Sequence, residues 1–382
     1  MLMADIVTLI IFFIGIYYLG IALFAFFPAV KTRKSTKQNT FAVIIPAHNE
    51  ENVIRDLLIS IKNANYPRKN ISTFVIADGC TDKTADIAKQ MGATVIEKEN
   101  ASRKGDALKT AFSAIEFLSG NFDCVSVFDA DNIVDSNFFA EMNDLINSGF
   151  SVVQGYVDSK NPNASWVSTA HSMWYFITNR IFQTGRSRLN MGAKLNGTGF
   201  VVKTDILKKI PWDTVTLSED AEYTCTLALS QIKVHYAECA VVYDEKPVDF
   251  KTSVSQRKRW AQGMRDVQGE YTLKLLFKGY INALLGLWND TLSVIIPFLM
   301  LVLTIFNIGI WESFAGKIAV YLYIILWFAL CMLALIYDKK ADRKIILNLF
   351  SLILYITSWV PIGISGLFEK GKLSWKHTKH GM

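Results

Sequence analysis

Residues 124–132 read CVSVFDADN, a short apolar run that ends in two aspartates separated by one residue. Two similar runs come earlier, residues 41–45 before PAHNE and residues 73–77 before DGCTD. A helical pattern follows each of these two, near residues 50–61 and 82–91. Strands that alternate with helices of this length predict an α/β fold with a mostly parallel sheet. In such a sheet the polar residues that follow the strands meet at one edge, where ligands bind.

The pair Asp129 and Asp131 is a weak signal alone, because two acids in a loop more often form a solvated turn or a helix cap. Here the pair follows an apolar strand and is expected to share a sheet edge with Asp78. Carboxylates in this position can hold Mg²⁺ or Mn²⁺, which prefer oxygen ligands and leave positions for phosphate oxygens. The pattern therefore predicts a diphosphate site with a divalent cation.

A basic stretch, SRKGDALKTA, covers residues 102–111. It opens a helix with Arg103, Lys104 and Gly105, so that a cation and backbone N–H groups can face an anion together. Taken alone, the stretch is better explained as the basic start of a surface helix.

An acidic stretch, LSED, covers residues 217–220 and begins another helical pattern. Ser218 suits an N-cap, and Glu219 and Asp220 are favourable in a first helical turn, so a structural role explains all three. If the acidic pair instead faces the metal site, Asp220 is placed to act as a general base.

Both ends of the chain carry uncharged apolar runs. Each is long enough for a helix to cross a bilayer, and they cover residues 6–30, 291–310, 318–337 and 345–368. The first run favours a retained anchor over a cleaved signal peptide, because it is long and Asp5 stands where a basic flank would be. The basic stretch KTRKSTK after it predicts a cytoplasmic middle domain by the positive-inside rule.

The fourth run conflicts with that rule. Four crossings place the basic tail, residues 369–382, outside the cell. The alternative is a re-entrant segment, broken at Pro361 and Gly363. We predict a crossing, which makes about four in all.

Six motifs occur in order before the last membrane runs: PAHNE, ADGCTD, FDADN, NGTGFVV at residues 196–202, LSED, and QRKRW at residues 256–260. Together they resemble family 2 glycosyltransferases of the membrane-integrated type. That group includes the cellulose, hyaluronan, chitin-oligosaccharide and poly-N-acetylglucosamine synthases. The resemblance covers residues 40–263, and an ordered set of motifs is far more specific than its members. It implies a GT-A fold with a Rossmann-like mixed sheet, a nucleotide-sugar donor and inversion at the anomeric carbon.

The resemblance also implies roles at the donor site. Asp129 and Asp131 approach the diphosphate and the metal, with Asp131 as the direct ligand. Lys104 offers the diphosphate a cation. The nucleoside pocket is assigned to Pro46, His48, Asn49, Glu50 and Asp78.

On the acceptor side, Glu219 and Asp220 are the candidate catalytic pair, with Asp220 as the base that takes a proton from the acceptor hydroxyl. Gln256, Arg259 and Trp260 correspond to an element beside the acceptor and the leaving diphosphate, where Trp260 offers a flat face to a sugar ring. The alternative for this stretch is a basic interfacial helix with Arg and Trp side chains at the lipid headgroups.

The expected organisation has five parts. They are an N-terminal membrane helix (1–30), a cytosolic GT-A domain (31–265), an interfacial amphipathic helix (266–288), about three membrane helices (289–368) and a basic tail (369–382).

The formal charge of +6 suits an anionic inner leaflet, and because the cations are dispersed we expect no nucleic-acid partner. We therefore expect a multi-pass protein of the plasma membrane.

Three functions fit these patterns. The first is a processive synthase that elongates a β-linked polysaccharide from UDP-glucose or UDP-N-acetylglucosamine. The second is a glycosyltransferase that acts on a lipid acceptor such as diacylglycerol, ceramide or a polyprenyl phosphate. The third is a nucleotide sensor that gates a transporter, which the acidic residues at the strand ends disfavour.

Overall fold

The computed structural model describes residues 2–28, 34–118, 122–340 and 342–368. Within these ranges the strands form one eight-stranded sheet in the order β3-β2-β1-β4-β7-β6-β8-β5. Their bounds are β1 (Phe41–Ala47), β2 (Ile71–Asp78), β3 (Thr94–Lys98), β4 (Cys124–Val127), β5 (Ile133–Val134), β6 (Val152–Ser159), β7 (Phe200–Lys203) and β8 (Val234–Asp244).

The strand directions determine which edge of the sheet carries the carboxyl ends of the strands. β3, β2, β1 and β4 are mutually parallel, which confirms the predicted parallel half. β7 runs antiparallel to both β4 and β6, and β6 runs parallel to β8. It follows that β4, β6 and β8 share one direction, so the carboxyl ends of six strands lie at the same edge of a mixed sheet. β5 is antiparallel to β8.

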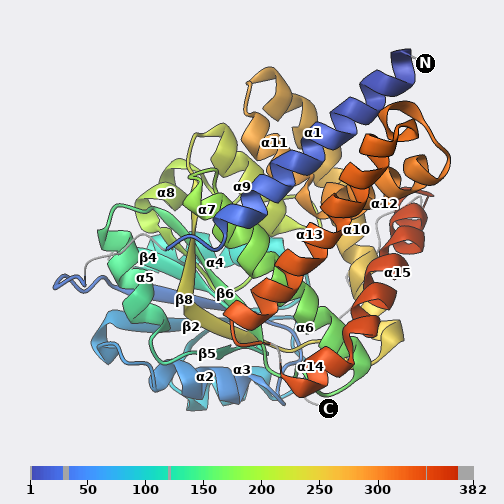
Figure 1. The fold of residues 1–382 in the computed structure, drawn as a ribbon. Helices are drawn as coiled ribbons and strands as arrows, with labels where there is room; N and C mark the ends of the chain where they lie inside the picture. Colours follow the sequence, from blue (N-terminus) through green and yellow to red (C-terminus); the bar gives the residue numbers. More distant parts are fainter. Residues whose placement is uncertain (1, 29–33, 119–121, 341, 369–382) are drawn as a thin grey trace.

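Helices cover both faces of the sheet (Figure 1). Along β1, side chains alternate between the two cores because successive strand residues point to opposite faces. Phe41, Val43 and Ile45 pack with α2 (Ile54–Lys62) and α5 (Phe138–Asn147). Ala42 and Ile44 pack on the other face with α4 (Lys104–Leu118) and α9 (Glu219–Leu229). The result is a three-layer α/β domain.

The remaining helices and turns complete the chain. They are η1 (Arg68–Asn70), α3 (Thr84–Gln90), α6 (Trp166–Thr178), the π-helical η2 (Asn179–Thr184), α7 (Gly185–Arg188), α8 (Thr204–Lys209), α10 (Phe250–Phe277), α11 (Ile281–Leu287), α12 (Asn289–Ile305), η3 (Gly309–Glu312), α13 (Phe314–Tyr337), α14 (Arg343–Leu347) and α15 (Leu349–Phe368), with α1 (Leu2–Phe24) at the N-terminus.

Two predicted helix boundaries were wrong. The first helix was expected from residue 50 but begins at Ile54, because Asn49 has a φ of 55° and the chain turns there before the helix starts. The segment 266–288 was expected to be one interfacial helix. It is instead the end of α10 followed by α11, with the break at Gly279, whose φ of 71° is the left-handed conformation that ends many helices.

The membrane crossings differ from the predicted four. In the part of the chain that the structure describes, α1 and α13 are each long and apolar enough to cross a membrane. A third crossing requires α11 and α12 to act as one span, although they meet at a bend of 65°. The fourth run forms α15, whose apolar part is shorter, Leu349–Gly363. The tail and residues 31–33 of the basic stretch lie outside the described residues.

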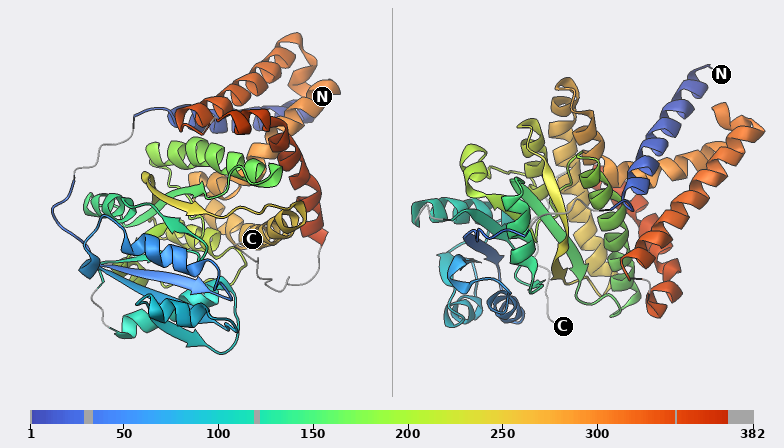
Figure 2. Two further views of the ribbon diagram at one scale, coloured as in Figure 1. Left: turned by 90° about the horizontal axis from the view of Figure 1, so that it is seen from below. Right: turned by 60° about the vertical axis from the view of Figure 1, so that its left-hand side comes forward.

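The apolar helices form two groups (Figure 2). α1, α12 and α13 pack against one another, whereas α15 packs against α6 and α10 of the α/β domain. The first group has its far end at η3, where Thr8 of α1 accepts a hydrogen bond from the Ile310 N–H at 3.4 Å. α1, α12 and α13 therefore form one packed group of helices, while α15 lies along the α/β domain.

A buried ion network fixes this first group to the domain. Arg180 in η2 pairs with Glu238 of β8 at 2.6 Å and with Asp338, which directly follows α13. Arg188 pairs with the same Glu238 at 2.6 Å and donates to the Ala25 carbonyl oxygen after α1, also at 2.6 Å. Because Arg180 and Asp338 are both largely buried, removing either partner would leave an uncompensated charge.

Gly185 of α7 lies against α1, so a substitution at this position tests how α1 packs on the domain. A Cβ atom at this position would lie 2.3 Å from the Ile21 carbonyl oxygen of α1, so the backbone itself would have to move. Overpacking of this kind costs about 1–3 kcal/mol. We therefore expect Gly185→Ala to lower the thermal unfolding midpoint of the detergent-solubilised protein. As a matched control, Gly20→Ala adds a methyl group to open space on α1 and should leave the midpoint unchanged or raised. Equal midpoints for the two variants would contradict this docking.

Candidate active site

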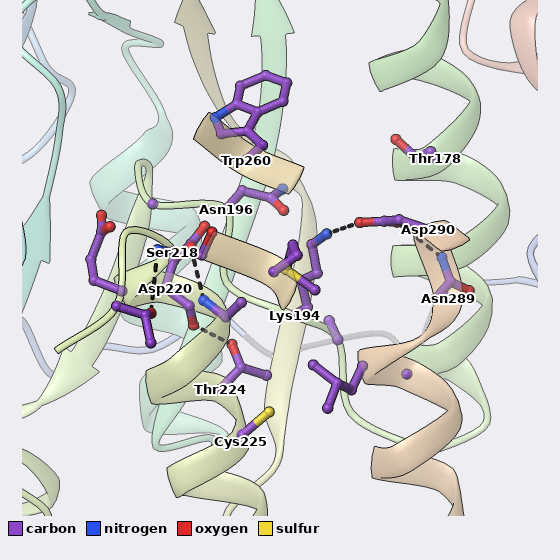
Figure 3. A pocket seen from close by; sticks show the side chains of 18 of the residues that line it. Thr178, Lys194, Asn196, Ser218, Asp220, Thr224, Cys225, Trp260, Asn289 and Asp290 are labelled. Atoms are coloured by element: carbon purple, nitrogen blue, oxygen red, sulfur yellow. Dashed lines mark hydrogen bonds and ion pairs between the residues drawn. The ribbon is translucent and has the colours of Figure 1, made fainter. Parts of the chain in front are cut away.

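A cavity of about 1870 Å³ opens at the carboxyl ends of the parallel strands. All but one of the predicted site residues line it, namely Pro46, His48, Glu50, Asp78, Lys104, Asp129, Asp131, Glu219, Asp220, Gln256, Arg259 and Trp260. Figure 3 shows part of its wall around Asp220 and Trp260. The exception is Asn49, whose side-chain oxygen accepts hydrogen bonds from the Thr81 N–H at 2.8 Å and hydroxyl at 3.3 Å. Asn49 therefore ties the loops after β1 and β2 together.

The loops after β1 and β2 meet through His48 and Asp78. His48 Nδ1 lies 2.6 Å from the Asp78 carbonyl oxygen, so this ring nitrogen donates. The Asp78 carboxylate accepts from the Ser102 N–H at 2.8 Å and from its hydroxyl at 3.0 Å, and pairs with Lys98 at 3.0 Å. Asp78 is thus held rigidly beside the cavity by the segment that leads into α4.

Several acidic side chains lie close together after the end of β4. Asp131 is 5% exposed, and burial, followed by the charges of Asp244, Asp129 and Glu50, raises its pKa well above the usual value. Burial and the charge of Asp129 likewise raise the pKa of Glu50 to about 8. Asp244, at the end of β8, was not predicted. Its signal was the same as for the others, an acid directly after an apolar strand in VVYDEK.

This acidic cluster offers the carboxylate oxygens that a divalent cation prefers, in a setting where Lys104 already pairs with Asp129 and Lys246 with Asp244. Asn132 supports it by donating to Asp131 at 3.1 Å and to Asp244 at 3.0 Å. Among the described residues no group of three or more His, Cys, Asp or Glu is arranged to hold a metal alone. A cation here would therefore share its ligands between protein carboxylates and the donor.

Lys104 joins the acidic cluster to the catalytic helix. Its ammonium pairs with Asp129, donates to the Gly197 carbonyl oxygen at 2.9 Å and lies 3.9 Å from Glu219. Burial by itself lowers the pKa of Lys104, but the carboxylates of Asp129 and Glu219 outweigh it and raise the pKa. The side chain is therefore cationic and faces the cavity, so the surface interpretation of SRKGDALKTA was wrong for Lys104.

The acidic pair starts α9 beside Lys104. Burial raises the pKa of Glu219 to about 7, against the opposing charge of Lys104. Burial also raises the pKa of Asp220, and Lys194 opposes that shift. Lys194 pairs in turn with Asp290 at the start of α12 (Figure 3). The expected cap at Ser218 was only half right, since the residue occupies the N-cap position but its hydroxyl makes no capping bond.

The QRKRW segment lies within α10 and has two faces. Gln256, Arg259 and Trp260 line the cavity, and Arg259 is close enough for Glu219 to oppose the lowering of its pKa by burial. Arg257 points the other way and is 0% exposed, with its guanidinium 4.4 Å from the Tyr355 ring centre. It donates to the Ser358 hydroxyl at 2.6 Å, and this contact fixes α15 to α10. One face of the segment therefore lines the cavity, and the other packs against α15.

The last residue of the motif region, Gly263, sets the distance between α10 and the start of α9. A Cβ atom here would lie 2.3 Å from the Ser218 hydroxyl oxygen and 2.8 Å from the Ser218 backbone nitrogen. α10 can pack this closely on the start of α9 only because the position carries no side chain. The placement of Glu219 and Asp220 relative to Arg259 depends on this contact.

The sheet, its acidic strand ends and the cavity define a GT-A fold built for a nucleotide-linked substrate. A family model described as "Glycosyltransferase like family 2" matches residues 38–263, more than half of the chain. The chain belongs to this family, which confirms the expected family and fold class.

Known relatives differ in what they make. A probable glycosyltransferase, YdaM, of Bacillus subtilis is 26% identical over 58% of this chain and 54% of its own length. A beta-monoglucosyldiacylglycerol synthase of Nostoc sp. is 26% identical over 58% and 48%, respectively. A poly-beta-1,6-N-acetyl-D-glucosamine synthase of Staphylococcus epidermidis is 24% identical over 67% and 64%. The chain thus spans between about half and two thirds of these relatives.

One solved structure covers nearly the whole fold. The mannosyltransferase PcManGT from Pyrobaculum calidifontis, solved with GDP-Man and Mn²⁺, superposes with a TM-score of 0.60 at 16% identity. The match covers 96% of this chain and 99% of that one, so the architecture extends to the apolar helices.

Ionisation of the acidic pair predicts a pH dependence. A general base must be deprotonated, and the pair carries raised pKa values, near 7 for Glu219. We therefore expect kcat/KM for sugar transfer to rise as the pH increases through about 7, with the inflection belonging to the pair rather than to one residue. Initial rates measured from about pH 5.5 to 8.5 would check this. A flat profile across that interval would contradict a carboxylate base in this environment.

Gly263 provides a second test. Gly263→Ala should push α10 away from Ser218 and shift Arg259 relative to the acidic pair. Displacements of about 1 Å cost on the order of a hundredfold in rate, so we expect a loss of that size in kcat for a protein that still folds. Gly269→Ala adds the same methyl group to open space in the same helix and should retain activity. Comparable rates for both variants would remove the proposed spacing role of Gly263.

Proposed function

We propose that the protein is an inverting glycosyltransferase that uses a UDP-sugar, glucose or N-acetylglucosamine, at the cytoplasmic face of the plasma membrane. The observation that carries the proposal is the arrangement around Lys104, which brings the acidic strand ends and the pair Glu219 and Asp220 to one cavity. The family membership of residues 38–263 and the two apolar helices that can cross a membrane support it.

In this proposal the donor lies along the sheet edge. Pro46, His48, Glu50 and Asp78 surround the nucleoside, and Asp129 and Asp131 would hold Mg²⁺ or Mn²⁺. The cation supplies charge stabilisation for the diphosphate when bound. The Pyrobaculum relative in the solved structure carries Mn²⁺, which supports a divalent ion here without choosing between the two. Lys104 and Arg259 place fixed positive charges where the leaving diphosphate becomes more negative.

Asp220 is the proposed base. Its carboxylate removes the proton from an acceptor hydroxyl, whose oxygen attacks the anomeric carbon as the bond to the diphosphate breaks. Attack from the side opposite the leaving group inverts the anomeric configuration. Lys194 lies within electrostatic reach and opposes protonation of Asp220. Trp260 offers an apolar face on which a sugar ring stacks.

Two acceptor classes follow from the relatives, a growing polysaccharide and a membrane lipid. The deciding experiment uses the purified protein in lipid nanodiscs with UDP-glucose, UDP-N-acetylglucosamine and GDP-mannose, each with Mg²⁺, Mn²⁺ or EDTA. Nucleoside diphosphate release names the donor and the cation, and sizing of the labelled product separates a polymer from a glycolipid. No release with any donor would refute the proposed function.

Asp220→Asn separates catalysis from binding. The amide keeps the shape of the side chain but cannot accept the proton, so we expect sugar transfer to fall by at least about 10²–10⁴-fold. UDP binding, measured by calorimetry with the chosen cation, should remain within error of the unmodified protein. Ser230→Ala, at the other end of α9, is the matched control and should retain activity. Full transfer activity in Asp220→Asn would remove the assignment of the base.

A further inference from the structure

The cavity is larger than a nucleotide sugar requires. Its volume of about 1870 Å³ exceeds the roughly 300–1,000 Å³ typical of small-molecule pockets. It follows one face of α10 from Gln256 to Thr272, with Arg259, Met264 and Gln268 between them at helical spacing. At 1.5 Å per residue this stretch is about 24 Å long. The cavity therefore continues well past the catalytic pair.

The chemistry of the wall differs between parts of the cavity. Near the strand ends the lining is charged, with the carboxylates and Lys104 described above. Another part of the wall is apolar, formed by Ile295, Phe298 and Leu299 of α12 and by Trp359, Val360 and Gly363 of α15, and it begins beside Trp260, whose ring centre lies 6.5 Å from that of Trp359. An apolar passage suits a hydrocarbon chain and does not suit a polysaccharide, whose hydroxyl groups would lose their hydrogen bonds to water there.

This apolar end reaches the surface between two separately packed helices. α12 packs with the membrane helices α1 and α13, whereas α15 packs with α6 and α10. Phe298 on α12 and Val360 on α15 both line the cavity and are 58% and 48% exposed, so they flank its mouth. α12 packs with α1 and α13, the two described helices that are long and apolar enough to cross a membrane, so a mouth beside α12 would open toward lipid.

Between the acids and the mouth, the lining suits a hydroxyl group. The side-chain oxygens of Gln256 and Asn289 are buried and, among the described residues, have no hydrogen-bond partner. Both residues line the same cavity as Asp220. An amide oxygen without a donor is satisfied by a hydroxyl and not by a phosphate, which carries only acceptors when ionised. Asp220 likewise needs a proton to remove.

We propose that the acceptor is a membrane lipid with a free hydroxyl headgroup. Its head lies beside Asp220, and its hydrocarbon chain leaves the cavity into the bilayer between α12 and α15. This inference rests on the proposed transfer from a UDP-sugar and names the acceptor of that reaction. The new bond joins the lipid oxygen to the anomeric carbon, the bond to the diphosphate breaks, and the hydroxyl proton passes to Asp220.

Gly363 gives a way to block the mouth. A Cβ atom at this position meets nothing within 4 Å, so a larger side chain fits without disturbing the fold and fills the apolar passage. Gly363→Leu is compared with Gly20→Leu, which places the same side chain in open space on α1, away from the cavity. Both full-length variants are assayed in nanodiscs with the labelled UDP-sugar and either dioleoylglycerol or its short-chain analogue dioctanoylglycerol.

We expect Gly363→Leu to lower kcat/KM for dioleoylglycerol on the order of tenfold, because the added side chain would occupy space that the hydrocarbon chain needs. The loss with dioctanoylglycerol should be clearly smaller, and UDP binding and the activity of Gly20→Leu should be unchanged. Equal losses for both chain lengths, or none, would overturn the proposed passage. Labelling of polyprenyl phosphate but not of dioleoylglycerol would overturn the hydroxyl headgroup.

The test also separates this inference from the proposed function. A wild-type protein that releases UDP and builds a water-soluble polymer, unaffected by Gly363→Leu, would refute the lipid acceptor and leave the glycosyltransferase standing. A wild-type protein that releases no UDP with any donor would refute both.

Discussion

The ammonium group of Lys104 lies between two acidic regions that would otherwise repel each other. Asp129 follows β4, Glu219 starts α9, and the Gly197 carbonyl belongs to the loop before β7, so one cation joins three segments distant in sequence. Because the group is buried among carboxylates, its charge is retained. The acidic strand ends and the start of α9 meet at this point, and the close packing of Gly263 on Ser218 holds α10 against α9.

Much of the sheet could be predicted because its first strands are continuous apolar runs that end in polar residues. The same pattern identified Asp78, Asp129 and Asp131, which do line one cavity. β7 escaped prediction because its pairing with β4 and β6 is set by tertiary contacts. Asp244 was missed for a related reason, since the direction of β8 follows from that pairing.

Other misreadings concern what a side chain faces. Lys104 and Arg257 both belong to basic stretches that look like solvated surface, yet one faces the cavity and the other is enclosed by aromatic rings of α15. The periodicity of a helix indicates which residues share a face, but it does not say which neighbour covers that face. For the same reason, an apolar run of 24 residues could be identified as membrane-seeking although α15 lies along the catalytic domain.

The network around Arg180 has a consequence for biogenesis. Arg180 lies near the middle of the chain, whereas Asp338 is synthesised only after α13 has been completed. Until then Glu238 must balance both Arg180 and Arg188, an arrangement with one carboxylate for two largely buried cations. The α/β domain therefore reaches its final charge balance only when the segment after α13 has been synthesised and packed. Synthesis of the C-terminal helices and completion of this network are in this way linked in a fixed order, and a prematurely terminated chain would present an incomplete domain to quality control.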